Sequence, residues 1–478
     1  MAVLEHLEPK SVFSFFEQIC AIPHGSGNTK AISDYLVRFA EARALEHYQD
    51  ALNNVIIIKE AAPGYESAEP VILQGHMDMV CEKAPDCTKD MASEGLDLAV
   101  EGDTVYARGT TLGGDDGIAV AMALAVLDDP DLPHPRIEAV FTVDEETGMD
   151  GAFGIDVSPL KAKRLINIDS EAEGIFTVSC AGGCRANCVI PVTRAPFSGA
   201  ALRVDVEGLA GGHSGTEIDK GRANADKLLG RVLLTCANRL PLRIISVSGG
   251  LKDNAIPTAA CATLIAGDEA ALRDVCAQMD KTLKEEFCVT DPGVAVRVSA
   301  AEAAAPMDEA STRRVLCLLT CVPNGIQTMS ADIKGLVQTS LNLGILTTQP
   351  DSVSASFSVR SSVESQKKML LERLACLTEQ LGGSVSTHGD YPGWAYRQES
   401  PLRDLLTAVY TDQYGRAPVI EAIHAGLECG LFSGKIPGLD CISIGPDLTD
   451  IHTFREKLHV ASTARTWALV TEALKRMK

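Results

Sequence analysis

The segment Val71-Ile72-Leu73-Gln74-Gly75-His76-Met77-Asp78 decides the fold, because an apolar run leads directly into a histidine and an acid. The run from Val71 to Gly75 predicts a buried strand. Residues two apart on a strand point to the same side, so His76 and Asp78 can face one cavity. A neutral imidazole and a carboxylate suit zinc, cobalt or manganese. The segment therefore predicts a buried sheet with metal-binding groups at a strand end.

A glycine-rich turn follows downstream, Gly113-Gly114-Asp115-Asp116-Gly117, and leads into the apolar run Ile118 to Leu127. This pattern predicts a helix with Asp115 at its head. Free amide groups there favour the charged carboxylate and leave its second oxygen free to bridge two cations.

Two more apolar runs end in acids. Ile137 to Val143 precedes Asp144-Glu145-Glu146, and Arg164 to Ile168 precedes Asp169. Three consecutive acids repel each other, and a cation would relieve that repulsion. Consecutive acids in this run would point in opposite directions, so one could bind metal while the other acts as a base. In open α/β sheets, ligands bind at the carboxyl ends of the strands.

Each segment alone also has an ordinary interpretation. Asp115 or Asp116 could be a plain helix cap. The acids 144–146 could be a solvated surface, and His76 could be a core histidine with its hydrogen bonds satisfied. The repetition of a strand followed by an acid, together with a histidine at position 452, favours one shared metal site over four coincidences.

Composition narrows the class of protein. The 478 residues are enough for two or three domains, and 46% hydrophobic with 22% charged residues is typical of a globular protein. A net charge of −21 disfavours nucleic acid and anionic lipid as partners, because phosphate binding needs clustered cations.

The compartment expected from the sequence is the cytoplasm. The first ten residues lack the basic start and apolar core of a secretory signal, and the apolar run Gly117 to Leu127 is too short to cross a bilayer. Fifteen cysteines are an odd number, which favours reduced thiols over a disulfide framework. Cys180, Cys184 and Cys188 could bind a metal, but their even spacing favours one buried strand face.

Helix and strand patterns divide the chain into three segments. Residues 1–184 alternate helices (Ser11 to Ala21, Thr29 to Ala44) with apolar strands, which predicts a three-layer α/β/α domain with a mainly parallel sheet. Residues 185–397 pair strands with long helices, for example Asp219 to Asn238, and carry no clustered ligands. They predict an inserted α+β lid domain. Residues 398–478 must return to the first sheet, because they carry His452.

Ordered motifs along nearly the whole chain resemble a known family, the zinc-dependent exopeptidases that include glutamate carboxypeptidases, aminoacylases and cytosolic dipeptidases. The aminoacyl-histidine dipeptidase branch (peptidase D, or Xaa-His dipeptidase) is the most similar. The motifs that carry the resemblance are Ile22-Pro23-His24-Gly25-Ser26, Gln74 to Val80, the turn at Asp115, Thr142 to Met149, Asn167 to Glu171, Gly211-Gly212-His213-Ser214-Gly215, His424 to Gly430, and Ile451-His452.

The resemblance implies a peptidase with two divalent metals per subunit, most often zinc, with cobalt or manganese as alternatives. A water activated between the metals would hydrolyse the peptide bond of unblocked dipeptides, among them Xaa-His. Glu145 resembles the general base, and Asp78 resembles the carboxylate that orients a ligating histidine. The implied ligands are His76, Asp115 as the bridge, Glu146, Asp169 and His452. Which metal each terminal ligand serves stays open.

The resemblance also implies groups that hold the substrate. His213 would donate to the oxyanion when the domains close, and Arg360 with Asn254 would hold the terminal carboxylate. His424 and Glu428 would shape recognition of the amino end. The expected partners are a small peptide and a second copy of the chain, bound through the lid domain.

Three departures from the branch leave its ligands intact: Asp116 replaces asparagine, Gly114 replaces alanine, and Thr453-Phe454-Arg455-Glu456 replaces Ser-Pro-Asp-Glu. The preferred side chains and metal therefore stay open. Two other functions are compatible with the sequence. One is an amidohydrolase that acts on N-acyl amino acids with the same metals, and the other is a non-catalytic metal-binding protein.

Overall fold

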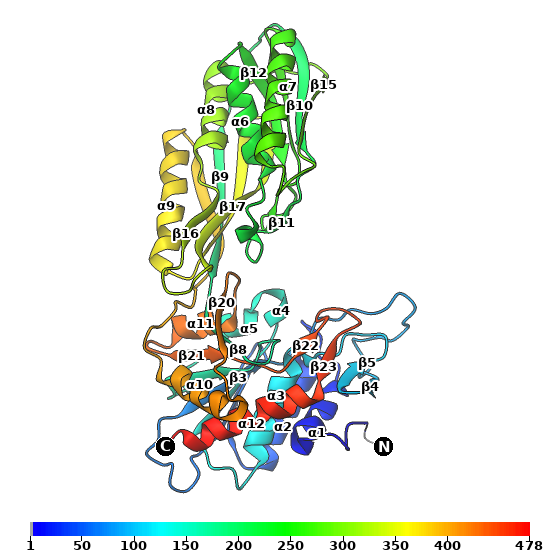
Figure 1. Ribbon diagram of the computed structural model, residues 1–478, viewed down its shortest axis with the longest axis vertical. Coiled ribbons are helices and arrows are strands. Elements are labelled where there is room, and N and C mark those ends of the chain that lie inside the picture. Colours follow the sequence, from blue (N-terminus) through cyan, green and yellow to red (C-terminus); the bar gives the residue numbers. More distant parts are fainter. Residues whose placement is uncertain (1–2) are drawn as a thin grey trace. The chain divides into compact units, whose positions relative to one another are not determined.

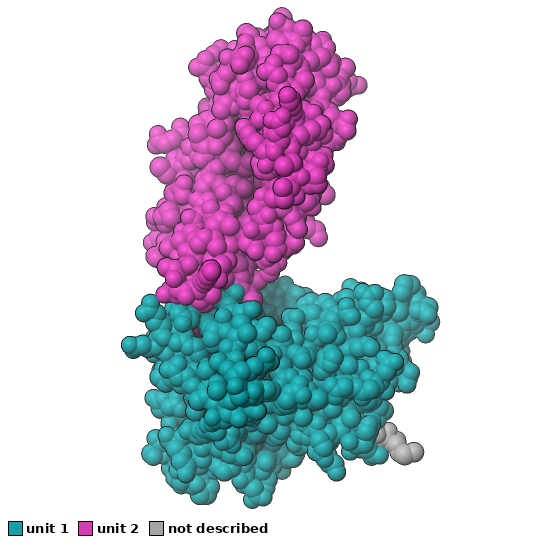
Figure 2. All heavy atoms as spheres, in the orientation of Figure 1, with its two compact units in different colours: residues 1–179, 396–422, 427–478 teal, residues 180–395, 423–426 magenta. Residues whose placement is uncertain are grey.

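The computed structural model describes residues 3–478, which divide into two compact units (Figure 2). Unit 1 runs from residue 3 to Ser179 and resumes at Tyr396–Ala422 and Leu427–Lys478. Unit 2 consists of Cys180–Ala395 and Ile423–Gly426. The boundaries predicted from the sequence lie after residues 184 and 397, and Ile423–Gly426 were expected in the segment that returns to the first sheet, whereas they belong to unit 2. These residues do so because the Ala181 amide donates to the carbonyls of Ile423 and Ala425.

The main sheet of unit 1 has eight strands. Their order is β1 (Glu46–Gln49), β2 (Val55–Lys59), β6 (Ile137–Thr142), β3 (Val71–His76), β7 (Arg164–Asn167), β21 (Asp440–Ser443), β8 (Ile175–Cys180) and β20 (Val419–Ile423) (Figure 1). The four central strands, from β6 to β21, run parallel. The pairings of β1 with β2, β2 with β6, and β21 with β8 are antiparallel. The sheet is therefore parallel at its centre and mixed at its flanks.

Helices cover both faces of this sheet. All six residues of β3 are buried, as expected for a parallel strand. A Cβ added at Gly75 would lie 2.6 Å from the Cβ of Ala119 in α3 (Gly114–Asp128), whereas Gln74 bonds to Glu428 in α11 (Glu428–Lys435). Because neighbouring strand residues point to opposite faces, α3 and α11 lie on opposite sides of the sheet. This confirms the predicted three-layer fold. The remaining helices of unit 1 are α1 (Lys10–Cys20), α2 (Lys30–Ala42), α4 (Glu145–Gly148), α5 (Asp150–Gly154), α10 (Pro401–Tyr414) and α12 (Val460–Arg476).

A small second sheet brings the C-terminal segment into unit 1. Its order is β22 (Leu448–Thr449), β23 (Lys457–His459), β5 (Thr104–Ala107) and β4 (Leu98–Glu101). Leu458 pairs with Val105 in the antiparallel register. The loop between β22 and β23, which carries His452, is therefore anchored beside the N-terminal half of the chain.

Unit 2 is built on a nine-stranded sheet with antiparallel pairings. Helices pack on it over a core in which Leu202, Val204 and Val206 are buried, as alternation along a strand requires. This confirms the predicted α+β character. The strand order is β15 (Ala295–Ala300), β10 (Ala200–Glu207), β14 (Ala260–Ala266), β12 (Leu242–Gly249), β17 (Val337–Thr348), β18 (Ser352–Ser361), β9 (Gly182–Pro191) and β19 (Ser384–Tyr391), with β16 (Gly325–Met329) beside β17.

The helices of unit 2 are α6 (Ala225–Ala237), α7 (Glu269–Glu286), α8 (Glu309–Cys321) and α9 (Glu364–Gln380), with a short 3-10 helix at Ile218–Lys220. A two-stranded ribbon pairs β11 (Gly212–His213) with β13 (Ala255–Ile256). The prediction of one helix over Asp219 to Asn238 was wrong. Asn224 caps α6 by accepting the amides of Asp226 and Lys227, so the helix begins at Ala225.

Two expectations about the chain as a whole can be compared with the structure. Among residues 3–478, no helix combines the length and apolar character that a membrane span needs. All fifteen cysteines are free thiols, and Cys180, Cys184 and Cys188 are buried on β8 and β9.

Candidate metal centre and substrate-binding groups

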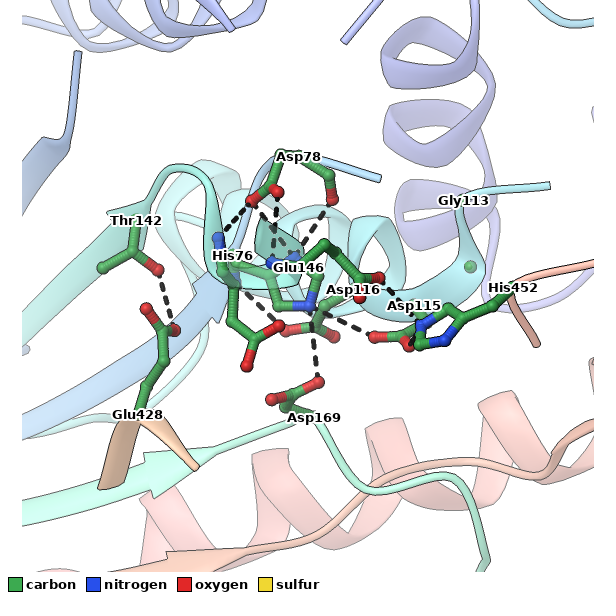
Figure 3. Close-up of polar contacts among 12 residues, drawn as sticks. His76, Asp78, Gly113, Asp115, Asp116, Thr142, Glu146, Asp169, Glu428 and His452 are labelled. Carbon is green, nitrogen blue, oxygen red and sulfur yellow. Dashed lines mark hydrogen bonds and ion pairs between the residues drawn. The ribbon is translucent and has the colours of Figure 1, made fainter. Parts of the chain in front are cut away.

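Two histidines from opposite ends of the chain hold the Asp115 carboxylate between them (Figure 3). His76, the last residue of β3, places Nε2 3.2 Å from Asp115 Oδ1. His452, in the loop after β22, places Nε2 3.0 Å from Asp115 Oδ2. Each oxygen of one carboxylate therefore faces a different imidazole, as a bridging ligand requires.

Glu146 and Asp169 complete the cluster. Glu146 Oε1 lies 2.9 Å from His452 Nε2, and Asp169 Oδ1 lies 3.6 Å from His76 Nε2. The structure thus brings together all five residues that the sequence nominated as ligands. Two sets of three donors have ligand atoms within 4.8 Å of one another: His76, Asp115 and Glu146, and His76, Asp116 and Asp169.

Asp78 fixes the tautomer of His76. The Nδ1 of His76 lies 3.0 Å from the Asp78 carbonyl oxygen, which can only accept a hydrogen bond. In the neutral ring, the form that can bind a metal, Nδ1 therefore carries the proton and the lone pair of Nε2 points toward Asp115 and Asp169. The Asp78 carboxylate also lies 3.5 Å from Nδ1 and accepts a hydrogen bond from Ser26 at 2.8 Å.

Glu145 stands beside this cluster at the start of the short helix α4. Its backbone amide donates to Asp78 Oδ1 at 3.1 Å, so the carboxylate that holds His76 also positions Glu145. Burial raises the pKa of Glu145 to about 9, with further contributions from the charges of Asp169 and Glu428. A buried carboxyl that readily keeps a proton suits the exchange of protons with a substrate.

The electrostatics of the cluster fit bound cations. Burial raises the pKa of Asp169. Burial also opposes ionisation of Asp115, but the neighbouring His452 and His76 imidazoles lower its pKa. Among the described residues, the buried Glu146 Oε1 makes no hydrogen bond of good geometry despite its proximity to His452. Imidazoles and carboxylates with an unsatisfied oxygen form a donor set for divalent transition metals.

Sequence reasoning missed two acids of this site. Asp116 was treated as a helix cap or as a departure from the family, yet it is buried, accepts the His76 amide at 3.2 Å on Oδ2, and lies among the metal donors. Its position in the same glycine-rich turn was the available signal. Glu456 carries no local signal other than its place four residues after His452, although its carboxylate binds the turn that carries Asp115.

Glu428 lies beneath the cluster on the face of β3 opposite α3. Its Oε2 accepts hydrogen bonds from Gln74 and, at 2.8 Å, from Thr142. Its Oε1 is buried without a partner among residues 3–478, and burial raises the pKa of Glu428 to about 7. Gln74 and Thr142 lie on adjacent parallel strands, so Glu428 joins these strands below the site.

A cluster of cationic and imidazole groups lies in unit 2. These groups surround Gly215. A Cβ built on this glycine would lie 2.6 Å from the His424 carbonyl, 3.0 Å from His213 Cε1 and 3.1 Å from Arg360 Nε. Arg360 Nη1 donates to Tyr391 at 3.3 Å, but the buried Nε has no partner in the described chain. Burial and then the Arg360 charge lower the pKa of His424 to about 3. A fixed guanidinium with a free N–H is suited to bind an anion.

His424 therefore lies next to Arg360, whereas the sequence analysis grouped it with Glu428. The His213 Nδ1 accepts the Thr216 backbone amide at 3.1 Å, so Nε2 carries the proton of the neutral ring. Burial and Arg360 lower the pKa of His213, which favours this neutral form. Asn254 and His213 line a cavity of about 910 Å³ within unit 2.

Comparison with known proteins gives a consistent assignment. Peptidase family M20/M25/M40 matches residues 72–476. A protein of Escherichia coli (strain K12) named cytosol non-specific dipeptidase is 38% identical over 482 residues, which cover 100% of this chain and 99% of that protein. The crystal structure of an aminoacylhistidine dipeptidase from Vibrio alginolyticus has a TM-score of 0.94 at 35% identity, with 98% of both chains covered. An aminopeptidase from Bacillus cereus shares the fold, with a TM-score of 0.57 at 15% identity and coverage of 98% of this chain and 99% of that one. The chain belongs to peptidase family M20/M25/M40.

Proposed function

We propose that this protein is a metal-dependent dipeptidase that hydrolyses the peptide bond of unblocked dipeptides. The observation that carries the proposal is the Asp115 carboxylate held between His76 and His452 (Figure 3), with the Glu145 amide anchored on the Asp78 carboxylate beside His76. The similarity along the full chain to a cytosol non-specific dipeptidase and to an aminoacylhistidine dipeptidase supports this substrate class. The name of the first relative also supports a cytosolic location.

His76, Asp115, Glu146, Asp169 and His452 would hold two divalent cations, most often zinc, with Asp115 shared between them. The cations would polarise the scissile carbonyl and make water a better nucleophile at neutral pH. Asp116 offers a fourth carboxylate next to this set, so it would influence which cation binds most tightly.

Glu145 acts as general base and acid. It takes the proton from the attacking water and passes it to the departing amine. Asp78 holds the proton on His76 Nδ1 and anchors the Glu145 backbone, so one carboxylate orients both a ligand and the base.

Unit 2 binds the carboxyl end of the peptide. Arg360, with its free Nε–H, would bind the terminal carboxylate beside His424, and Asn254 would hold the same end. His213, protonated on Nε2, would donate to the oxyanion. Glu428 would favour a free amino end through its negative charge. The association of two chains through unit 2 is part of the same proposal.

The test is a dipeptide panel assayed on metal-stripped protein, with zinc, cobalt and manganese added back separately. We expect the stripped protein to be inactive and at least one metal to restore cleavage of free dipeptides, including Xaa-His. N-acetylated dipeptides serve as the matched control and should be cleaved poorly. Equal or preferred cleavage of the acetylated forms would instead identify an N-acyl amidohydrolase, and bound metal without any cleavage would contradict enzymatic function.

A further inference from the structure

Glu456 makes an unusual set of contacts for a carboxylate on the C-terminal segment. Its side chain is only 3% exposed, and its two oxygens accept hydrogen bonds from four successive backbone amides. A carboxylate offers about four lone-pair sites, so this arrangement uses nearly all of them. The donors are Leu112 (2.8 Å) and Gly113 (3.1 Å) to Oε2, and Gly114 (2.8 Å) and Asp115 (3.4 Å) to Oε1.

These amides belong to the glycine-rich turn that begins α3, in which Asp115 and Asp116 have non-helical backbone angles. The first amides of a helix have no partner within the helix, and a negative group near them is favourable. Gly113 at the cap position has no side chain to accept a hydrogen bond, and its φ of 67° favours glycine. Glu456, more than 340 residues away in sequence, supplies the missing cap.

The same carboxylate fixes the segment that carries His452. The Glu456 amide donates to the Thr453 carbonyl at 3.1 Å, which folds residues 453–456, directly after His452, into a compact turn. Leu448, just before this turn, also packs against Gly114, where an added Cβ would lie 2.7 Å from its Cδ2. Glu456 therefore ties the backbone of Asp115 to the loop whose His452 faces Asp115 Oδ2.

We propose that Glu456 is a positioning residue that holds Asp115 and His452 at ligand distance and so sets the affinity of the cation position formed by Asp115, Glu146 and His452. The inference rests on the proposed function, because it assigns Glu456 a role in the metal centre. The position nearer His76 and Asp169 depends less on Glu456, because His76 ends the central strand β3 and Asp169 follows shortly after β7.

The decisive variant is Glu456→Gln, which replaces one acceptor oxygen with an amide group that faces two backbone N–H donors. Its matched control is Glu138→Gln in the same unit. Glu138 is also fully buried and accepts the amides of Lys161 (2.9 and 3.0 Å) and Ala162 (3.0 Å), but it bonds to none of the proposed ligands. A second variant, Glu456→Asp, keeps the charge and withdraws it by one methylene, in case the first variant folds poorly.

The readout is zinc stoichiometry and affinity of each folded protein, measured by equilibrium dialysis against a competing chelator, with the melting temperature recorded in parallel. We expect two bound zinc ions in the wild type and in Glu138→Gln. Both Glu456 variants should lose affinity for one zinc by about 10- to 100-fold, the range usual for residues that orient ligands, while the other zinc changes less.

Unchanged affinity for both zinc ions in the folded Glu456 variants would overturn the inference, and so would an equal loss in Glu138→Gln, since that would be general damage to the fold. A wild type that binds fewer than two zinc ions would instead contradict the two-cation centre of the proposed function. Failure of the inference is thus distinguishable from failure of the metal centre.

Discussion

Glu145 is the residue whose substitution should separate chemistry from metal binding. Because it is a buried carboxyl beside the donors but outside the proposed ligand set, Glu145→Gln should lower kcat by a factor of about 10² to 10⁴. Metal content, measured by elemental analysis, should stay near the wild-type value. Turnover that survives in this variant would refute its assignment as the base.

Arg360 should control recognition of the terminal carboxylate. Arg360→Met removes the free Nε–H of the guanidinium. We expect kcat/KM for a free dipeptide to fall by about 10- to 100-fold, as the loss of a charge-assisted hydrogen bond of about 1.5–3 kcal/mol implies. The C-terminally amidated dipeptide should be affected little. Arg273→Met, an exposed arginine on α7 paired with Glu269, is the control and should change neither substrate.

His76, Glu146 and Asp169 could be nominated from sequence because each ends or follows an apolar run, and these runs form adjacent parallel strands. His76 and Asp169 are fixed by such short-range patterns. Glu456 could not be found in this way, since its partners are backbone amides that belong to a distant turn. The position of His424 beside Arg360 likewise depends on contacts that return Ile423–Gly426 to unit 2.

At the scale of elements, Asn224 shows how one polar residue sets a helix start and its packing. Its side chain caps α6 and also donates to Asn342 at 3.1 Å and to the Leu343 carbonyl at 2.8 Å on β17. Helical periodicity over residues 219–238 cannot reveal this, because the cap competes locally with helix continuation. The core faces were predictable because hydrophobic alternation reports them, whereas helix ends depend on such single side chains.

Asn224→Ala should therefore destabilise unit 2 by more than an ordinary cap substitution. Loss of the cap costs about 0.5–2 kcal/mol, and the unpaired Leu343 carbonyl adds about 1–3 kcal/mol. The matched control is Asp268→Ala, which removes an exposed cap that bonds only the Ala271 amide. Urea unfolding gives the loss in free energy of unfolding for each variant. The difference between the two losses measures the contribution of the buried hydrogen bonds of Asn224. Equal losses would show that Asn224 acts as a cap alone.

At the scale of the whole molecule, zinc should stabilise unit 1 and not unit 2, because the proposed ligands all belong to unit 1. Zinc at about one hundred times its Kd adds about 2.7 kcal/mol to the stability of the folded site. Calorimetry with and without a chelator should therefore shift the unfolding of unit 1 and leave that of unit 2 in place. Identical shifts of both transitions would contradict confinement of the metal to unit 1.

The stability of unit 2 should instead depend on pH, through the ionisation of Asp226. Both Asp226 oxygens are buried without a hydrogen-bond partner in residues 3–478, and burial raises its pKa to about 8. The folded state thus keeps a proton that the unfolded state releases near pH 4, so the stability contributed by this group is complete below pH 4 and is lost as pH rises toward 8. The loss amounts to at most about 6 kcal/mol, since the pKa rises from 3.8 to about 8 and one pKa unit corresponds to about 1.4 kcal/mol.

Asp226→Asn keeps a neutral side chain of the same shape and removes this titration. We expect urea unfolding of unit 2 to lose most of its dependence on pH between 5 and 8, with the variant more stable than the wild type at pH 8. Asp274→Asn, an exposed acid on α7, should retain the wild-type slope. Because Asp226 is remote in sequence from the metal ligands, zinc should not alter this difference. A slope that persists in Asp226→Asn would assign the pH dependence to other groups.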